Sequence, residues 1–126
     1  MMTPQLFYLI VGIIVVLYGR RLLMRRAIIH YDAGTVGRKV KGKENILLLD
    51  VRTSGERSRR HIRGSVHIPL HELKGRMREL EEFRDKEIIC YCQSGNRSLS
   101  ASHTLKRNGF RVANLSCGMS AWVGAE

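Results

Sequence analysis

Several residue types are scarce in this sequence of 126 residues, and each scarcity excludes a class of protein. Three cysteines, without a CxxC pair, do not build a disulfide scaffold, so we expect reduced thiols in a cytosol-facing domain. Aromatic residues make up 6% of the chain and no groove-reading motif is present, so nucleic acid is not an expected partner. Acidic residues number 11 against 22 lysines and arginines, and the net charge of +11 favours anionic partners.

Charged side chains are also absent from the first 19 residues, and residues 6–19 (LFYLIVGIIVVLYG) are almost wholly apolar. A membrane span needs about 20 residues, a length that is reached by counting from Met2 and allowing Arg20 and Arg21 to snorkel. The positive charges follow the apolar run, and no A-x-A-like cleavage site follows it, so an anchor is favoured over a signal peptide or a soluble helix. Residues 1–26 are therefore predicted to form a single-pass transmembrane anchor with a basic flank.

The basic flank predicts the orientation of this anchor. It contains Arg20, Arg21, Arg25 and Arg26. Arginines beside a span are retained on the cytoplasmic side, so the sequence predicts a bacterial-type inner (cytoplasmic) membrane protein with its N-terminus outside. The domain that follows, residues 27–126, is expected to face the cytoplasm and to be attracted to the anionic membrane surface.

Strands and helices alternate along residues 27–126, which predicts an α/β domain with a mostly parallel sheet. Strands are expected at 27–31, 46–51, 66–68, 87–92 and 110–115, helices at 71–83 and 99–108, a weak helix within 32–43 and a last helical turn at 119–123. Asp50 and Cys92 end two strongly apolar strands. Because open α/β sheets bind ligands beyond the carboxyl ends of their strands, both residues are predicted to border one pocket.

The segment after Cys92 combines a thiol with groups that stabilise negative charge. Backbone N–H groups of residues 93–98 are able to form an anion-binding nest at a helix N-terminus, where Gly95 permits the turn and Arg97 adds a cation. These groups are expected to lower the pKa of the Cys92 thiol and to make it a nucleophile.

The other cysteines and histidines have weaker patterns. Cys90 lies inside the strand and is expected in the core, whereas Cys117 is interpreted as structural, with a second, resolving thiol as the alternative. His67 and His71 have a metal-like spacing, but Pro69 interrupts the helix that would align them, so no metal site is expected.

The sequence resembles a single-domain rhodanese, which is a thiosulfate sulfurtransferase-like module. Three segments carry the resemblance: ILLLDVRTSGERSRRHIRGSVHIPL, IICYCQSGNRSLSASHTLKRNGF and VANLSCGMSAW. The resemblance covers residues 28–122 and implies a five-stranded α/β fold with helices on its faces. It also implies a Cys92 persulfide, with no other cofactor, that carries sulfane sulfur from a small anionic donor such as thiosulfate to a thiol or protein acceptor. The implied site consists of Cys92 and Arg97 as catalytic residues, Gln93, Ser94, Gly95, Asn96 and Ser98 as the persulfide cradle, and Asp50, Arg52 and His61 as supporting residues.

Four residues depart from the pattern of that family. Arg57 stands where an aromatic residue is usual, Arg60 and Cys117 where glycine is usual, and Arg63 where proline is common. Together with Arg59, the arginines make a basic segment, which we interpret as a solvated face, with electrostatic gathering of anions or lipid as the alternative. Because of these departures, the resemblance implies the fold but does not identify the substrate.

Two other functions are compatible with the same fold. A phosphatase or an arsenate reductase also uses a cysteine–arginine cradle, but the resemblance implies a longer loop there than the four residues between Cys92 and Arg97. The shorter loop suits a sulfur atom better than a tetrahedral phosphate. A non-catalytic docking module at the membrane is the third possibility, and the intact Cys92 loop argues against it.

Overall fold

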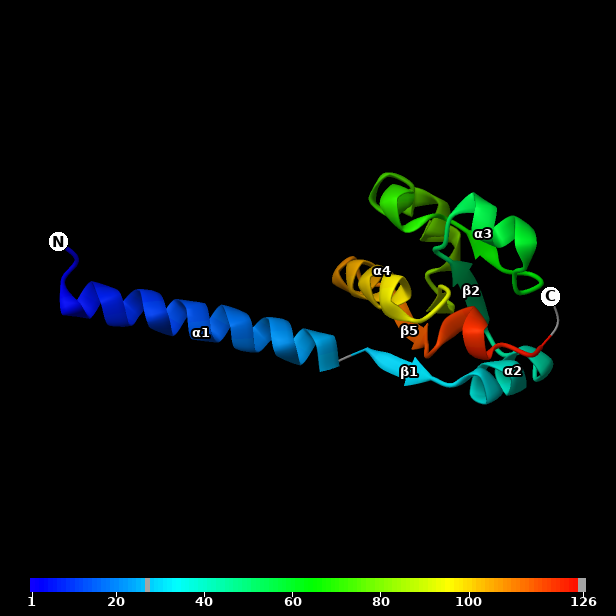
Figure 1. Cartoon of the computed structure of the whole chain (residues 1–126), viewed down its shortest axis with the longest axis horizontal. Helices are drawn as coiled ribbons and strands as arrows, with labels where there is room; N and C mark the ends of the chain where they lie inside the picture. The colour runs from blue at the N-terminus through cyan, green and yellow to red at the C-terminus, as the bar shows by residue number, and fades with distance from the viewer. Residues whose placement is uncertain (27, 125–126) are drawn as a thin grey trace.

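A long amino-terminal helix and a mixed α/β domain make up the structure, a computed structural model that describes residues 1–26 and 28–124, without the side chains of residues 24–26. The helix, α1 (Pro4–Arg26), leads into the first strand, β1 (Ile29–Tyr31), at one end of the domain (Figure 1). The predicted α/β class is confirmed. The predicted start of the first strand at Ala27 and the predicted domain end at Glu126 lie outside the described residues.

Five parallel strands form the sheet in the order β1-β5-β4-β2-β3. The other strands are β2 (Ile46–Asp50), β3 (Val66–His67), β4 (Glu87–Tyr91) and β5 (Arg111–Leu115). β2 and β4 run in register from Ile46 opposite Glu87 to Asp50 opposite Tyr91. Asp50 and the residue before Cys92 therefore end side by side, as the sequence predicted.

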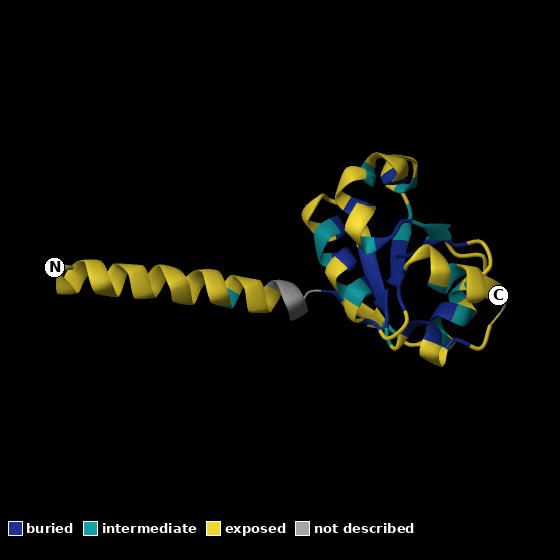
Figure 2. Ribbon diagram, turned by 45° about the horizontal axis from the view of Figure 1, so that its top comes forward, coloured by how far each residue is buried: buried dark blue, intermediate teal, exposed yellow. Residues whose placement is uncertain are grey.

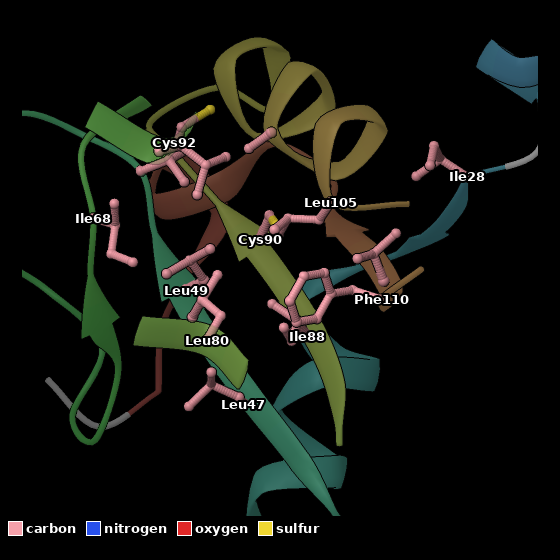
Figure 3. Close-up of a cluster of buried hydrophobic side chains, with 14 residues drawn as sticks. Ile28, Leu47, Leu49, Ile68, Leu80, Ile88, Cys90, Cys92, Leu105 and Phe110 are labelled. Atoms are coloured by element: carbon pink, nitrogen blue, oxygen red, sulfur yellow. The ribbon is translucent and has the colours of Figure 1, made fainter. Parts of the chain in front are cut away.

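Helices and turns cover both faces of the sheet. They are α2 (Ala33–Lys41), α3 (Ser54–Arg59), the 3-10 helices η1 (Leu70–Gly75) and η2 (Met77–Phe83), α4 (Asn96–Arg107) and the 3-10 helix η3 (Gly118–Ala121). On one face, Leu80 of η2 and Leu105 of α4 pack against strand residues that include Leu49, Ile88 and Cys90 (Figure 3). On the other face lie the side chains of Val36, Leu48, Ile62, Ile89, Tyr91, Ala113, Leu115, Met119 and Trp122.

The predicted helix over residues 71–83 is wrong in type. The chain forms two 3-10 helices here, separated at Arg76, which has φ −117° and ψ 14°. Gly75 at the junction is a poor helix former. In η2, the side chains of Met77, Leu80 and Phe83 all pack on the core, and their spacing of three residues matches one turn of a 3-10 helix.

Helix α1 differs from the rest of the molecule because its large apolar side chains are exposed from Leu6 to Leu23 (Figure 2). Residues Pro4–Leu23 have a mean hydropathy of 2.0, and none of this stretch is buried against the domain. By length and composition, α1 is able to cross a membrane.

Candidate active site

The turn from β4 into α4 places Cys92 at the start of a helix. The helix begins at Asn96, three residues earlier than the sequence predicted, and Gly95 is its N-cap with φ 105°. That left-handed conformation is one that glycine adopts at little cost. Arg97 and Ser98 therefore belong to the first helical turn, and the amino end of α4 faces the thiol.

The sulfur of Cys92 is hydrogen-bonded to two groups. The backbone N–H of Gly95 donates to Sγ at 3.0 Å, and the Ser98 hydroxyl lies 3.3 Å from it. Burial alone would raise the pKa of the Cys92 thiol, but hydrogen bonds from the Ser98 hydroxyl and from the backbone of Ser98, Gly95 and Ser94 outweigh it, so the pKa is lowered. The site therefore stabilises a thiolate.

Cys90, two residues earlier, has the opposite environment. Its side chain lies within the core between β4 and α4, whereas the sulfur of Cys92 points out of the top of the same cluster (Figure 3). Burial raises the pKa of the Cys90 thiol to about 12. The prediction that Cys90 is a core residue is confirmed.

The segment 117–120 holds the backbone of the Cys92 loop from the other side. Met119 N donates to the Cys92 carbonyl oxygen at 2.9 Å, and Ser120 N donates to that of Gln93 at 3.1 Å. Gly118 is packed so closely that an added Cβ would lie 2.0 Å from the Cys92 oxygen. Cys117 itself is exposed and has φ 62°, a conformation that explains why glycine is usual here.

Arg97 is brought to the site, but its guanidinium group is bound to Glu56. Nη1 and Nη2 donate to the two carboxylate oxygens at 2.6 and 2.7 Å. The hydrogen bonds from Arg97, opposed by partial burial, lower the pKa of Glu56 to about 2. The same carboxylate closes the capping box of α3 by accepting from Thr53 N at 3.2 Å, so one side chain joins α3 to the Cys92 loop.

Glu56 was not among the predicted site residues, and helix α3 was not predicted. The pattern Thr53-x-x-Glu56 is a capping-box signature that would have indicated the helix. Nothing in the spacing would have indicated that the carboxylate also pairs with Arg97, because the two residues are 41 positions apart.

Asp50 and Arg52 form a buried network under the site. Asp50 accepts from Arg52 Nε and Nη2 at 3.1 and 3.0 Å and from the Tyr91 hydroxyl at 3.1 Å. Desolvation opposes the negative charge of Asp50, but the bonds from Arg52 outweigh it and lower the pKa of the carboxyl group. Because Tyr91 precedes Cys92 directly, the network fixes the strand end from which the nucleophile extends.

The solvated face expected for the basic segment is wrong for two of its arginines. Arg57 Nη1 donates to Asp50 Oδ2 at 3.2 Å and to Ser65 Oγ at 3.0 Å, and Arg60 bonds the carbonyl oxygens of Met119 and Trp122. These bonds tie α3 to the sheet and to η3. Arg59 and Arg63, in contrast, are exposed as expected.

His61 supports the same segment and not the Cys92 loop directly, since its Nδ1 lies 3.1 Å from the Arg57 carbonyl oxygen.

The residues of the predicted persulfide cradle differ in exposure: Gln93, Ser94 and Asn96 are exposed, and Gly95 and Ser98 are buried. Among the described residues, no group of three or more histidine, cysteine or acidic side chains is placed to hold a metal ion.

The lowering of the Cys92 pKa leads to a testable dependence on pH. In detergent-solubilised full-length protein, the rate of Cys92 alkylation by iodoacetamide should reach half of its plateau below the usual cysteine pKa of about 8.5. Ser98→Ala removes a bond to the thiolate, so the midpoint should move to higher pH, whereas exposed Ser100→Ala should leave it unchanged. Peptide mass spectrometry separates Cys92 from Cys117. An unchanged midpoint in Ser98→Ala would show that the hydroxyl does not set the pKa.

Comparison with known proteins agrees with this geometry. Residues 33–125 match the rhodanese-like domain family. The chain is 45% identical over 87 residues to YrkF of Bacillus subtilis, whose name describes a sulfur carrier protein, covering 68% of this chain and 46% of YrkF. It is 34% identical over 93 residues to a sulfurtransferase of Allochromatium vinosum, covering 73% of this chain and 85% of the relative.

A solved structure is similar as well. The thiosulfate sulfurtransferase of Pseudomonas aeruginosa superposes with a TM-score of 0.69 at 26% identity, over 77% of this chain and 19% of that one. The chain thus spans about half of YrkF and a fifth of this structure. The matched residues include the whole sheet from β2 onward and the Cys92 loop, and the chain belongs to the rhodanese-like domain family.

Proposed function

We propose that the chain transfers sulfane sulfur as a persulfide on Cys92, at the cytoplasmic face of a membrane in which α1 is the anchor. The observation that carries the proposal is the pair of hydrogen bonds from Gly95 and Ser98 to a thiol of lowered pKa at the amino end of α4. The sulfurtransferase and sulfur carrier relatives support sulfur transfer in general. Thiosulfate as the donor is part of the proposal.

The chemistry requires two displacements at sulfur. The Cys92 thiolate attacks the outer sulfur of thiosulfate, the sulfur–sulfur bond of the donor breaks, and its electron pair leaves with sulfite. An acceptor thiolate then attacks the outer sulfur of the persulfide, and Cys92 leaves as a thiolate. In both steps, the backbone N–H groups at the amino end of α4 stabilise negative charge on the sulfur that remains.

Arg97 has a role in this scheme that depends on a change of partner. In the structure the guanidinium group is paired with Glu56, and the Cys92 side chain is 0% exposed. A doubly charged donor competes with Glu56 for Arg97, and side chains around the loop move to admit it. Arg97 would then hold the sulfonate end of thiosulfate while the outer sulfur approaches Sγ.

The membrane anchor rests on the exposed apolar surface of α1. Along Leu6–Tyr18, valine, leucine, isoleucine and aromatic side chains are exposed without interruption by charge. An apolar surface of this length is not left in water by a soluble protein, and a bilayer covers it fully. Arg20 and Arg21 follow directly and favour a cytoplasmic location for the domain.

The first test of the proposal compares the two neighbouring cysteines. Cys92→Ala should abolish sulfur transfer from thiosulfate to dithiothreitol, because it removes the atom that carries the sulfur. Cys90→Ala removes a core thiol with a raised pKa and should keep most of the activity. Steady-state sulfite release from full-length protein measures both. Loss of activity in a folded Cys90→Ala variant would contradict this division of roles.

The second test concerns Arg97. Arg97→Ala should lower kcat/KM for thiosulfate. The expected loss of transition-state stabilisation is about 1.5–3 kcal/mol, which is typical of a charge-assisted contact. Glu56→Gln keeps an oxygen for the capping box but removes the competing charge, so KM for thiosulfate should fall. Exposed Arg59→Ala on α3 is the control and should match the wild type. If Arg97→Ala matches the wild type at every donor concentration, Arg97 only connects the loop to α3.

A further inference from the structure

Gly95 lies between the sulfur of Cys92 and the end of β5. On one side, its N–H donates to Cys92 Sγ at 3.0 Å. On the other side, a Cβ added to this glycine would lie 3.3 Å from Cys117 N, 3.8 Å from Leu115 O and 3.9 Å from Asn114 Nδ2. The turn that carries the thiol therefore rests directly on the last strand of the sheet.

Asn114 of β5 makes the polar contact in this packing. The residue is 3% exposed, and its Nδ2 donates to the carbonyl oxygen of Gly95 at 3.4 Å. The same oxygen accepts from Leu99 N at 3.2 Å, at the start of α4. Asn114 thus connects the residue that binds the sulfur to the sheet, at the point where the helix begins.

The chemistry of the contact fixes the orientation of the Asn114 amide. A carbonyl oxygen only accepts hydrogen bonds, so the nitrogen of the amide, and not its oxygen, must face Gly95. The amide nitrogen has two hydrogens, and one of them is used in this bond. The other is available to a second acceptor on the same side of Asn114.

His30 of β1 supplies that second acceptor. Its Nδ1 lies 3.3 Å from Asn114 Nδ2, and the two residues are opposite each other in the register of β1 and β5. Because Nδ2 is a donor, the ring nitrogen accepts through its lone pair. Ile28, two residues earlier, is buried in the core cluster under α4 (Figure 3). A chain of hydrogen bonds therefore runs from the edge strand through Asn114 and Gly95 to Cys92.

Stability alone does not account for an asparagine at position 114. Its Oδ1 is buried, and no hydrogen-bond partner for it is found within the described part of the chain. A buried acceptor without a bond costs free energy, and an apolar side chain of similar shape avoids that cost. Val112, two residues earlier on the same face of β5, is such a buried apolar residue. The benefit of the amide is therefore sought in its bond to Gly95.

We propose that Asn114 is a positioning residue for Cys92. It holds Gly95 from the carbonyl side, so that the N–H of Gly95 remains directed at the sulfur, and His30 holds the amide in turn. Both residues act through Gly95 and not by contact with the donor. The inference rests on the proposed function, because it assigns what orients the thiolate that carries the sulfur.

Both displacements at sulfur depend on this orientation. Cys92 is the attacking thiolate in the first step and the leaving thiolate in the second, so Sγ bears negative charge in each. A donor that already points at the charged atom stabilises it without reorganisation during the reaction. Without the bond from Asn114, Gly95 has more freedom to turn its N–H away from the sulfur.

The test compares two variants of Asn114 that differ in size and lack the donor. Asn114→Leu keeps about the volume of the side chain, whereas Asn114→Ala removes most of it. In detergent-solubilised full-length protein, the rate of Cys92 alkylation by iodoacetamide is followed against pH, and thermal unfolding is measured for each variant. Asn45→Ala is the matched control, because Asn45 Nδ2 also donates to a backbone carbonyl oxygen, that of Asp85 at 2.9 Å, before β2 and β4 begin.

In both Asn114 variants, the pH midpoint of alkylation should rise by about 0.3–1 unit, which corresponds to one neutral hydrogen bond. The melting temperature of Asn114→Leu should equal or exceed that of the wild type, because the buried Oδ1 is removed. His30→Ala keeps the bond to Gly95 but releases the amide, so its midpoint should rise by less. Asn45→Ala should match the wild-type midpoint. Arg97 and Cys90, the titratable groups that interact with Cys92, are unchanged in all of these variants.

Four results would overturn the inference. An unchanged midpoint in both Asn114 variants would show that the amide does not orient Gly95, and a rise in Asn114→Ala alone would assign the effect to packing. An equal rise in Asn45→Ala, or a rise in Asn114→Leu together with a lower melting temperature, would indicate a general loosening of the fold. No rise in His30→Ala would remove His30 from the chain. Alkylation needs no sulfur donor, so these results are independent of whether the protein transfers sulfur.

Discussion

A parallel sheet has two unlike edges, and this constraint determines where the Cys92 site lies. Every strand that runs in the same direction adds its carboxyl end to one edge and its amino end to the other. Asp50, Tyr91 and Cys92 meet because β2 and β4 are neighbours in register. Helix α1 leads into β1, whose Ile29 lies opposite Ala113 in the middle of β5.

The chemistry of Cys92 depends on a balance between burial and hydrogen bonding. Cys90 and Cys92 extend from one strand into one core cluster, yet the pKa of Cys90 is raised to about 12 and that of Cys92 is lowered. The difference arises because Cys92 reaches the amino end of α4, where Gly95 N donates to its sulfur. A thiol moved by two residues along the strand changes from an inert core group to a stabilised thiolate.

Much of this arrangement could be predicted from local sequence. The apolar runs before Asp50 and Cys92 gave the two central strands, and the polar residues after them gave the edge that carries the site. Contacts between distant segments could not be predicted in this way. The pairing of Glu56 with Arg97 and the inward bonds of Arg57 and Arg60 depend on how α3 packs, and charge alone suggested a solvated face. The 3-10 geometry of residues 70–83 depends on packing against β2 and α4, which overrides helical periodicity.

The most direct test of the account is the mass of the protein after reaction with thiosulfate. Full-length wild-type protein should gain the mass of one sulfur atom, the peptide that contains Cys92 should carry it, and treatment with dithiothreitol should remove it. A protein without this gain, or with the added sulfur on Cys90 or Cys117, would contradict the assignment of Cys92 as the sulfur-carrying thiolate.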